Sequence, residues 1–139
     1  MGMAPRNGAQ PASILLVEDE PLILIDLEYA AEDLGSVPIC AQSCAEALAH
    51  IETMGASLSA AVLDVSLGGG ETCLPVAQAL DRLGVPYILH SGDLDRREEQ
   101  IRKLDAQLIA KPAQAEAVIA AALALARREG DGTQAMASR

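Results

Sequence analysis

The stretch Ala60-Ala61-Val62-Leu63-Asp64 combines four apolar residues with a carboxylate at its end. Short apolar runs of this length are typical of strands buried inside a parallel sheet. Two other runs have the same form: Ser13–Val17 precedes Glu18–Asp19, and Gln107–Ala110 precedes Lys111. Because ligands of parallel sheets gather outside the carboxyl ends of the strands, we expect these charged groups to share one pocket.

Between and after these runs, the pattern predicts further strands and helices in strict alternation. The two further strands are Val37–Ala41 and Pro86–His90, and the five helices are Pro21–Leu34, Ser43–Gly55, Thr72–Leu83, Asp93–Leu104 and Gln114–Arg128. Short parallel strands need helical crossovers, and both faces of their sheet need covering, so the sequence predicts one doubly wound α/β domain. We place this domain at residues 13–128, between disordered segments at 1–12 and 129–139.

Composition excludes several classes of function. The chain has a formal net charge of −10, no Phe or Trp and only two Tyr, so neither phosphate-backbone binding nor base stacking is expected and direct nucleic-acid binding is excluded. No apolar run is long enough to cross a membrane, which predicts no membrane insertion and a cytoplasmic location. The three cysteines lack paired metal spacing and are expected to be reduced.

The acids at the strand ends suggest a metal site. Glu18, Asp19 and Asp64 supply hard oxygen ligands of the kind that Mg²⁺ prefers, and a bound cation would offset their mutual repulsion. Asp64 could then act as a nucleophile toward a phosphoryl donor. Lys111 could pair with the phosphoryl oxygens, and the hydroxyl of Ser91 could donate a hydrogen bond to the same group.

Four motifs together resemble the receiver domain of bacterial two-component response regulators. They are Leu16-Val17-Glu18-Asp19-Glu20, Val62-Leu63-Asp64-Val65, His90-Ser91-Gly92 and Ala110-Lys111-Pro112. The resemblance implies a flavodoxin-like (βα)5 fold with strand order 2-1-3-4-5. It implies Mg²⁺ held by Glu18, Asp19, Asp64 and the backbone carbonyl of Ser66, and Ser91 and Lys111 as readers of the phosphoryl group.

The resemblance also implies partners. The phosphoryl group on Asp64 would come from a sensor histidine kinase or a histidine phosphotransfer protein, so the chain would be a phosphate acceptor with autodephosphorylation and not an enzyme acting on a separate substrate. It would alter the binding of a downstream protein, or serve as a phosphate sink or shuttle. A homodimer is a further association that the family allows.

Three positions depart from the family pattern. Leu108 stands where many receivers carry an aromatic switch residue, so the usual aromatic switch is absent. The stretch Pro86–Gly92 resembles a Phe-Ala-Thr-Gly subgroup of alphaproteobacterial single-domain receivers, but His90 and Ser91 replace the Ala and Thr of that motif. Switching would then act through Ser91 and the segment after it, or through Tyr87.

Other interpretations of the same residues stay open. Glu18-Asp19-Glu20 alone could be a solvated loop with charge near a helix N-terminus, and Asp64 alone could be a turn residue at a strand end. A second function is a receiver-like interaction module that works without phosphorylation. A third, a small Mg²⁺-dependent phosphatase that forms an aspartyl phosphate, is weakened because Val65 and Ser66 follow Asp64 where such enzymes carry a second aspartate.

Overall fold

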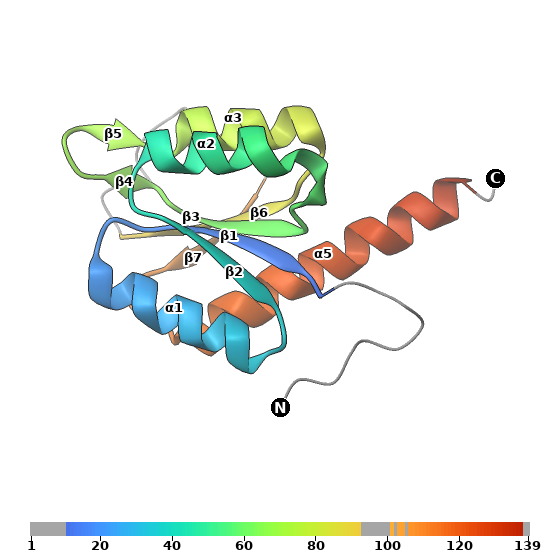
Figure 1. Ribbon diagram of the computed structural model, residues 1–139, viewed down its shortest axis with the longest axis horizontal. Helices are drawn as coiled ribbons and strands as arrows, with labels where there is room; N and C mark the ends of the chain where they lie inside the picture. Colours follow the sequence, from blue (N-terminus) through green and yellow to red (C-terminus); the bar gives the residue numbers. More distant parts are fainter. Residues whose placement is uncertain (1–10, 93–100, 102, 105, 138–139) are drawn as a thin grey trace.

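A five-stranded parallel sheet forms the centre of the computed structural model (Figure 1), which describes residues 11–92, 101, 103–104 and 106–137. The strands are β1 (Ser13–Val17), β2 (Val37–Ala41), β3 (Ala60–Asp64), β6 (Tyr87–Ser91) and β7 (Gln107–Ala110). Their spatial order is β2-β1-β3-β6-β7, and every neighbouring pair is parallel. This is the predicted order 2-1-3-4-5, so the predicted fold is confirmed.

Helices cover both faces of the sheet. Helices α2 (Cys44–Met54) and α3 (Leu74–Leu83) lie on one face, and α1 (Pro21–Asp33) and α5 (Ala115–Ala137) lie on the other (Figure 1). A one-turn 3-10 helix, η2 (Gly55–Ser57), follows α2. The alternating side chains of each strand therefore enter two separate cores: Leu15, Leu63 and Leu89 pack with α2 and α3, whereas Leu16, Val62 and Ile88 pack with α1 and α5.

Local signals in the sequence set the helix boundaries. Ser43 precedes α2, and its side-chain oxygen accepts a hydrogen bond from the backbone N–H of Glu46 at 3.2 Å. The Glu46 carboxylate reaches back to the N–H of Gln42 at 2.9 Å, so two donors at this helix start are satisfied. Helix α1 begins at Pro21, where the missing N–H costs nothing.

The glycine run after Asp64 forms the turn of a short hairpin. Gly68–Gly70 connects two short antiparallel strands, β4 (Ser66–Leu67) and β5 (Glu71–Thr72). Gly69 and Gly70 have φ angles of +67° and +81°, which residues with a side chain rarely adopt. Helix α3 consequently begins at Leu74 and not at Thr72.

The C-terminal boundary of the last helix was predicted wrongly. Helix α5 continues to Ala137, where a disordered tail was expected from residue 129. Gly130 and Gly132 each weaken a helix by about 1 kcal/mol relative to Ala, but no proline interrupts the stretch, so backbone hydrogen bonding can continue. The predicted helix at Asp93–Leu104 and the predicted disordered segment 1–12 lie largely outside the described residues, although Ile101 is helical and buried.

Three smaller findings complete the fold. Cys40, Cys44 and Cys73 are not joined to one another by disulfide bonds. Among the described residues, no helix has both the length and the apolar character needed to cross a membrane. Strand β6 runs over Tyr87–Ser91, one residue later than predicted, because the backbone oxygen of Ser91 accepts a hydrogen bond from the N–H of Lys111 at 2.8 Å.

Candidate functional site

The carboxyl ends of β1 and β3 bring three acids together. Glu18 and Asp19 follow β1 directly, Asp64 ends β3, and the two strands are neighbours in the sheet. One carboxylate oxygen from each of the three residues lies within 4.8 Å of the other two. Glu18 and Asp64 are almost fully buried, with 1% and 3% of their surfaces exposed. The acids that the sequence singled out therefore form one cluster.

Lys111 supplies a positive charge to this cluster from the end of β7. Its Nζ atom lies 3.1 Å from Glu18 Oε1 and 3.3 Å from Asp64 Oδ1. Glu18 is further fixed by its own loop, because its Oε2 atom accepts a hydrogen bond from the N–H of Glu20 at 3.1 Å. Lys111 thus bridges two buried acids that come from different strands.

Burial and crowding change the acidity of these groups. Burial, followed by hydrogen bonding and charge repulsion from Glu18, raises the pKa of Asp64 to about 8, although Lys111 acts against this shift. Burial alone would lower the pKa of Lys111, but the charges of Asp64 and Glu18 outweigh it and the pKa of Lys111 is raised. Without a further cation, the pocket therefore favours a protonated Asp64 beside a charged lysine.

The donor set fits a magnesium ion. Three carboxylates with oxygens this close repel one another, and one ammonium group cannot neutralise all three. Mg²⁺ binds through one or a few carboxylates and keeps waters and phosphate oxygens as its other ligands. Asp19, the most exposed of the three acids, leaves one side of such a site open to solvent. Glu18, Asp19 and Asp64 are therefore suited to hold Mg²⁺.

Ser91 lies at the end of β6, but its hydroxyl is engaged locally. The side chain is fully buried, and its Oγ atom donates a hydrogen bond to the backbone oxygen of Gly92 at 2.9 Å. The backbone oxygen of Ser91 accepts a hydrogen bond from the N–H of Lys111, so Ser91 lies close to the lysine of the pocket. Reaching a group on Asp64 would require the hydroxyl to leave Gly92 by rotation about χ1.

Ser66 and Gly68 lie in the hairpin that follows Asp64. Ser66 begins β4 with an exposed side chain, and its backbone carbonyl as a metal ligand stays a prediction. Gly68 is a residue whose role sequence reasoning missed: a Cβ atom at this position would lie 3.2 Å from Asp19 Oδ2. The hairpin thus packs closely against one of the three acids, a contact that only the run of glycines after Asp64 could have suggested.

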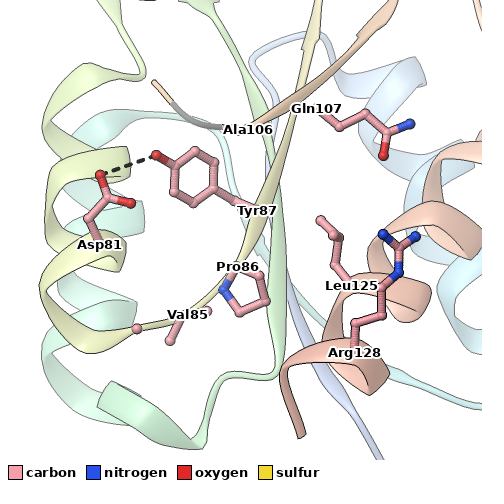
Figure 2. A pocket seen from close by; sticks show the side chains of 9 residues that line it. Asp81, Val85, Pro86, Tyr87, Ala106, Gln107, Leu125 and Arg128 are labelled. Carbon is pink, nitrogen blue, oxygen red and sulfur yellow. Dashed lines mark hydrogen bonds between the residues drawn. The ribbon is translucent and has the colours of Figure 1, made fainter. Parts of the chain in front are cut away.

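Another pocket, with a volume of about 300 Å³, lies at the opposite end of the sheet. It is lined near the amino ends of β6 and β7 by Pro86, Gln107 and Arg128, among others. Figure 2 shows that the Tyr87 hydroxyl on its wall points to Asp81, with which it forms a hydrogen bond of 3.2 Å. None of the predicted site residues lines this pocket, so the chemistry that the sequence predicts belongs at the carboxyl ends of the strands.

We compared the chain with known protein families, curated proteins and solved structures. A scan against protein-family models and a search of curated proteins found no match. Among solved structures, SdrG from Sphingomonas melonis Fr1 is 38% identical, with a TM-score of 0.68 over 84% of this chain and 96% of SdrG. A response regulator receiver protein from Sinorhizobium medicae WSM419 is 23% identical, with a TM-score of 0.72 over 86% of this chain and 98% of that protein.

A third structure supports the same fold. It is a CheY-like response regulator receiver domain from Methylobacillus flagellatus, 21% identical, with a TM-score of 0.69 over 84% of this chain and 99% of that domain. At this identity the likeness concerns the fold alone. The three alignments each span nearly the whole of the compared chain and most of this one.

Proposed function

Because this chain belongs to the receiver-domain family of response regulators, we propose that Asp64 accepts a phosphoryl group from a histidine kinase or a histidine phosphotransfer protein. The observation that carries the proposal is the position of Asp64. It is buried at the end of β3, with Lys111 at 3.3 Å and two further acids within reach of a shared cation. A carboxylate held in this way faces a donor that approaches the carboxyl ends of the strands.

The transfer step follows from the chemistry of the groups. An oxygen of ionised Asp64 attacks the phosphorus of a phosphohistidine, a P–O bond forms, and the P–N bond breaks, with its electron pair going to the imidazole nitrogen of the donor. Mg²⁺ bound by Glu18, Asp19 and Asp64 would supply positive charge for the transferred group. Lys111 would turn from the carboxylates to the phosphoryl oxygens, and Ser91 would donate its hydroxyl hydrogen to another of them.

The arrangement of the pocket also indicates what would follow the phosphorylation of Asp64. The chain would carry the phosphoryl group on its own side chain and lose it by hydrolysis, and would not turn over a separate substrate. The charge of Asp64 changes on phosphorylation, and Lys111 and Ser91 would rearrange around it. These changes would alter the binding of a downstream protein through β6, which carries Ser91, and β7, which Lys111 directly follows.

Helix α1 offers a surface on which the phosphodonor could dock. Leu22, Ile25 and Tyr29 lie at helical spacing with exposed fractions of 78%, 42% and 61%, an apolar stripe that begins four residues after Glu18. Exposed Asp26 and Asp33 lie on the same helix, which contains no Lys or Arg. We therefore expect a donor that places apolar side chains, flanked by basic ones, against α1 while its histidine faces Asp64.

Intact-mass analysis after incubation with acetyl phosphate tests the proposal. With Mg²⁺ present, the wild-type protein should gain about 80 Da, the mass of one phosphoryl group on a nucleophilic carboxylate. Asp64→Asn should gain nothing, whereas Asp33→Asn, which changes an exposed acid on α1, should behave as wild type. Equal labelling of the Asp64→Asn protein would refute the assignment.

Comparing phosphoryl transfer from a histidine protein with labelling by acetyl phosphate distinguishes a defect in docking on α1 from a defect in the pocket. Leu22→Ser and Tyr29→Ser remove exposed apolar side chains outside the pocket. They should slow transfer from a phosphorylated histidine protein at least about fivefold, roughly 1 kcal/mol of lost contact, while labelling by acetyl phosphate is unchanged. An equal loss with both donors would place the defect in the pocket or the fold and would rule out docking on this stripe.

A further inference from the structure

A cavity of about 160 Å³ lies on the α1 and α5 side of the sheet, next to the phosphoacceptor pocket, and Glu18, Asp19 and Asp64 are not part of its wall. Helix α1 contributes Ile23, Asp26 and Leu27 to its wall, and the end of β6 contributes His90. The remainder of the wall comes from the segment that follows β7, namely Lys111, Pro112, Ala113 and Ala115. Pro112 and Ala113 are exposed, so the cavity opens to the surface beside them.

His90 is the unusual member of this lining. Only 4% of its surface is exposed, and within the part of the chain that the structure describes neither ring nitrogen has a hydrogen-bond partner. Burial, and then the positive charge of Lys111, lower the pKa of His90, so the ring is neutral and carries one donor and one acceptor nitrogen. A buried polar group left without a partner is costly, and a molecule in the cavity would remove this cost.

Volume and chemistry define the class of that molecule. A cavity of about 150 Å³ lined by apolar side chains in another protein takes up benzene, so a single aromatic ring fits the space available here. Ile23, Leu27 and Ala115 provide apolar contacts for such a ring, and His90 provides one polar contact. We propose that this cavity is a binding site for a monocyclic aromatic compound with one hydroxyl group, which hydrogen-bonds to the ring of His90.

Lys111 connects this site to the phosphoacceptor pocket. Lys111 lines the cavity, while its Nζ atom lies 3.3 Å from Asp64 Oδ1. A ring bound against Lys111 would therefore restrict the movement that this lysine makes on phosphorylation. This coupling rests on the proposed function, whereas occupancy of the cavity does not.

Histidine side-chain NMR with phenol as the probe tests the site without any phosphodonor. The chain has two histidines, and a His50→Gln variant assigns their ring signals. Phenol should shift the His90 signals to a plateau and leave those of His50, on α2, unchanged. Benzene, which lacks the hydroxyl group, should bind at least about tenfold more weakly than phenol, the loss of about one hydrogen bond.

Two variants complete the test. His90→Leu should lose at least about tenfold in phenol affinity while its affinity for benzene is kept, since an apolar wall remains. Ala115→Met should fill the cavity from the start of α5 and abolish binding of both probes. The proposal would be overturned by any of three results: chemical shifts of His90 that change linearly with phenol and reach no plateau, equal affinity for phenol and benzene, or unchanged phenol binding in either variant. The cavity would then be a hydrated one. None of these results would alter the outcome of the acetyl phosphate experiment.

Discussion

Replacing Asp64 with Asn should remove a pH-dependent loss of stability from the metal-free protein. Burial, and then the proximity of Glu18, raise the pKa of Asp64 to about 8 in the folded state, whereas in the unfolded chain this carboxyl has an ordinary pKa of about 4. Between these two values the folded state holds a proton that the unfolded state has lost. The stability that protonated Asp64 contributes is thus complete below about pH 4 and is lost as the pH rises through about 8.

The size of this effect follows from proton linkage. Each tenfold difference in proton affinity corresponds to about 1.4 kcal/mol, so between about pH 5 and pH 8.5 the wild-type protein should lose about 4 kcal/mol of unfolding free energy through this group. The side-chain amide of the Asp64→Asn protein does not ionise, so this variant escapes the loss. A domain of this size has a total stability of about 5–15 kcal/mol, so the difference lies within the range of a denaturation experiment.

Urea unfolding followed by circular dichroism in EDTA, at about pH 5, 7 and 8.5, measures the difference directly. The stability of Asp64→Asn relative to wild type should rise steadily across this range, whereas Asp33→Asn should follow the wild type. Addition of Mg²⁺ should stabilise the wild-type protein at high pH more than Asp64→Asn, because the variant lacks one of the three carboxylates that would hold the ion. A relative stability that is constant with pH would mean that Asp64 is ionised throughout, and would refute the argument from burial and Glu18.

Three further variants test other parts of the structure. Gly68→Ala places a methyl group 3.2 Å from Asp19 Oδ2 and should weaken Mg²⁺ binding about threefold to tenfold, measured as the Mg²⁺-dependent rise in the urea midpoint. Asp33→Asn, which changes an exposed acid on α1, should leave this rise unchanged. Lys111→Met leaves two buried acids without their cation and should cost about 2–3 kcal/mol of unfolding free energy in EDTA, most of it recovered with Mg²⁺. Ser43→Ala removes the cap of α2 and should cost about 1 kcal/mol without changing phosphorylation. An unchanged Mg²⁺ affinity of Gly68→Ala would contradict the argument from the hairpin contact. Wild-type stability of Lys111→Met would contradict the argument from the buried ion pairs, and slower labelling of Ser43→Ala would contradict the separation of the α2 cap from the site.

Much of the fold could be predicted because buried parallel strands have a simple signature. The runs at Ser13–Val17, Val37–Ala41, Ala60–Asp64 and Gln107–Ala110 became strands with the expected boundaries. Parallel pairing then brought their carboxyl ends together, which explains why Asp64 and Lys111 could be assigned to one pocket although they are far apart in the sequence. Hydrophobic patterning and topology were sufficient for this step.

Features that depend on a few contacts could not be predicted. A pair of two-residue strands has no periodicity, so β4 and β5 could not be recognised in the sequence. The surroundings of His90 come from α1 and from the segment after β7, which lie far from it in sequence. The local hydrogen bond of Ser91 to Gly92 depends on a single rotamer, which no pattern of residue types specifies.

The scarcity of aromatic residues gives this protein a simple optical signal. With no Trp or Phe, its near-ultraviolet absorbance and fluorescence come from Tyr29 and Tyr87 alone. Tyr29 is 61% exposed on α1, whereas Tyr87 is 5% exposed on β6 and bonded to Asp81. A Tyr29→Ser protein would therefore report only on the strand that carries Ser91, and a Tyr87→Phe protein only on the proposed docking helix. Changes at β6 and changes at α1 can therefore each be followed in real time without an attached dye.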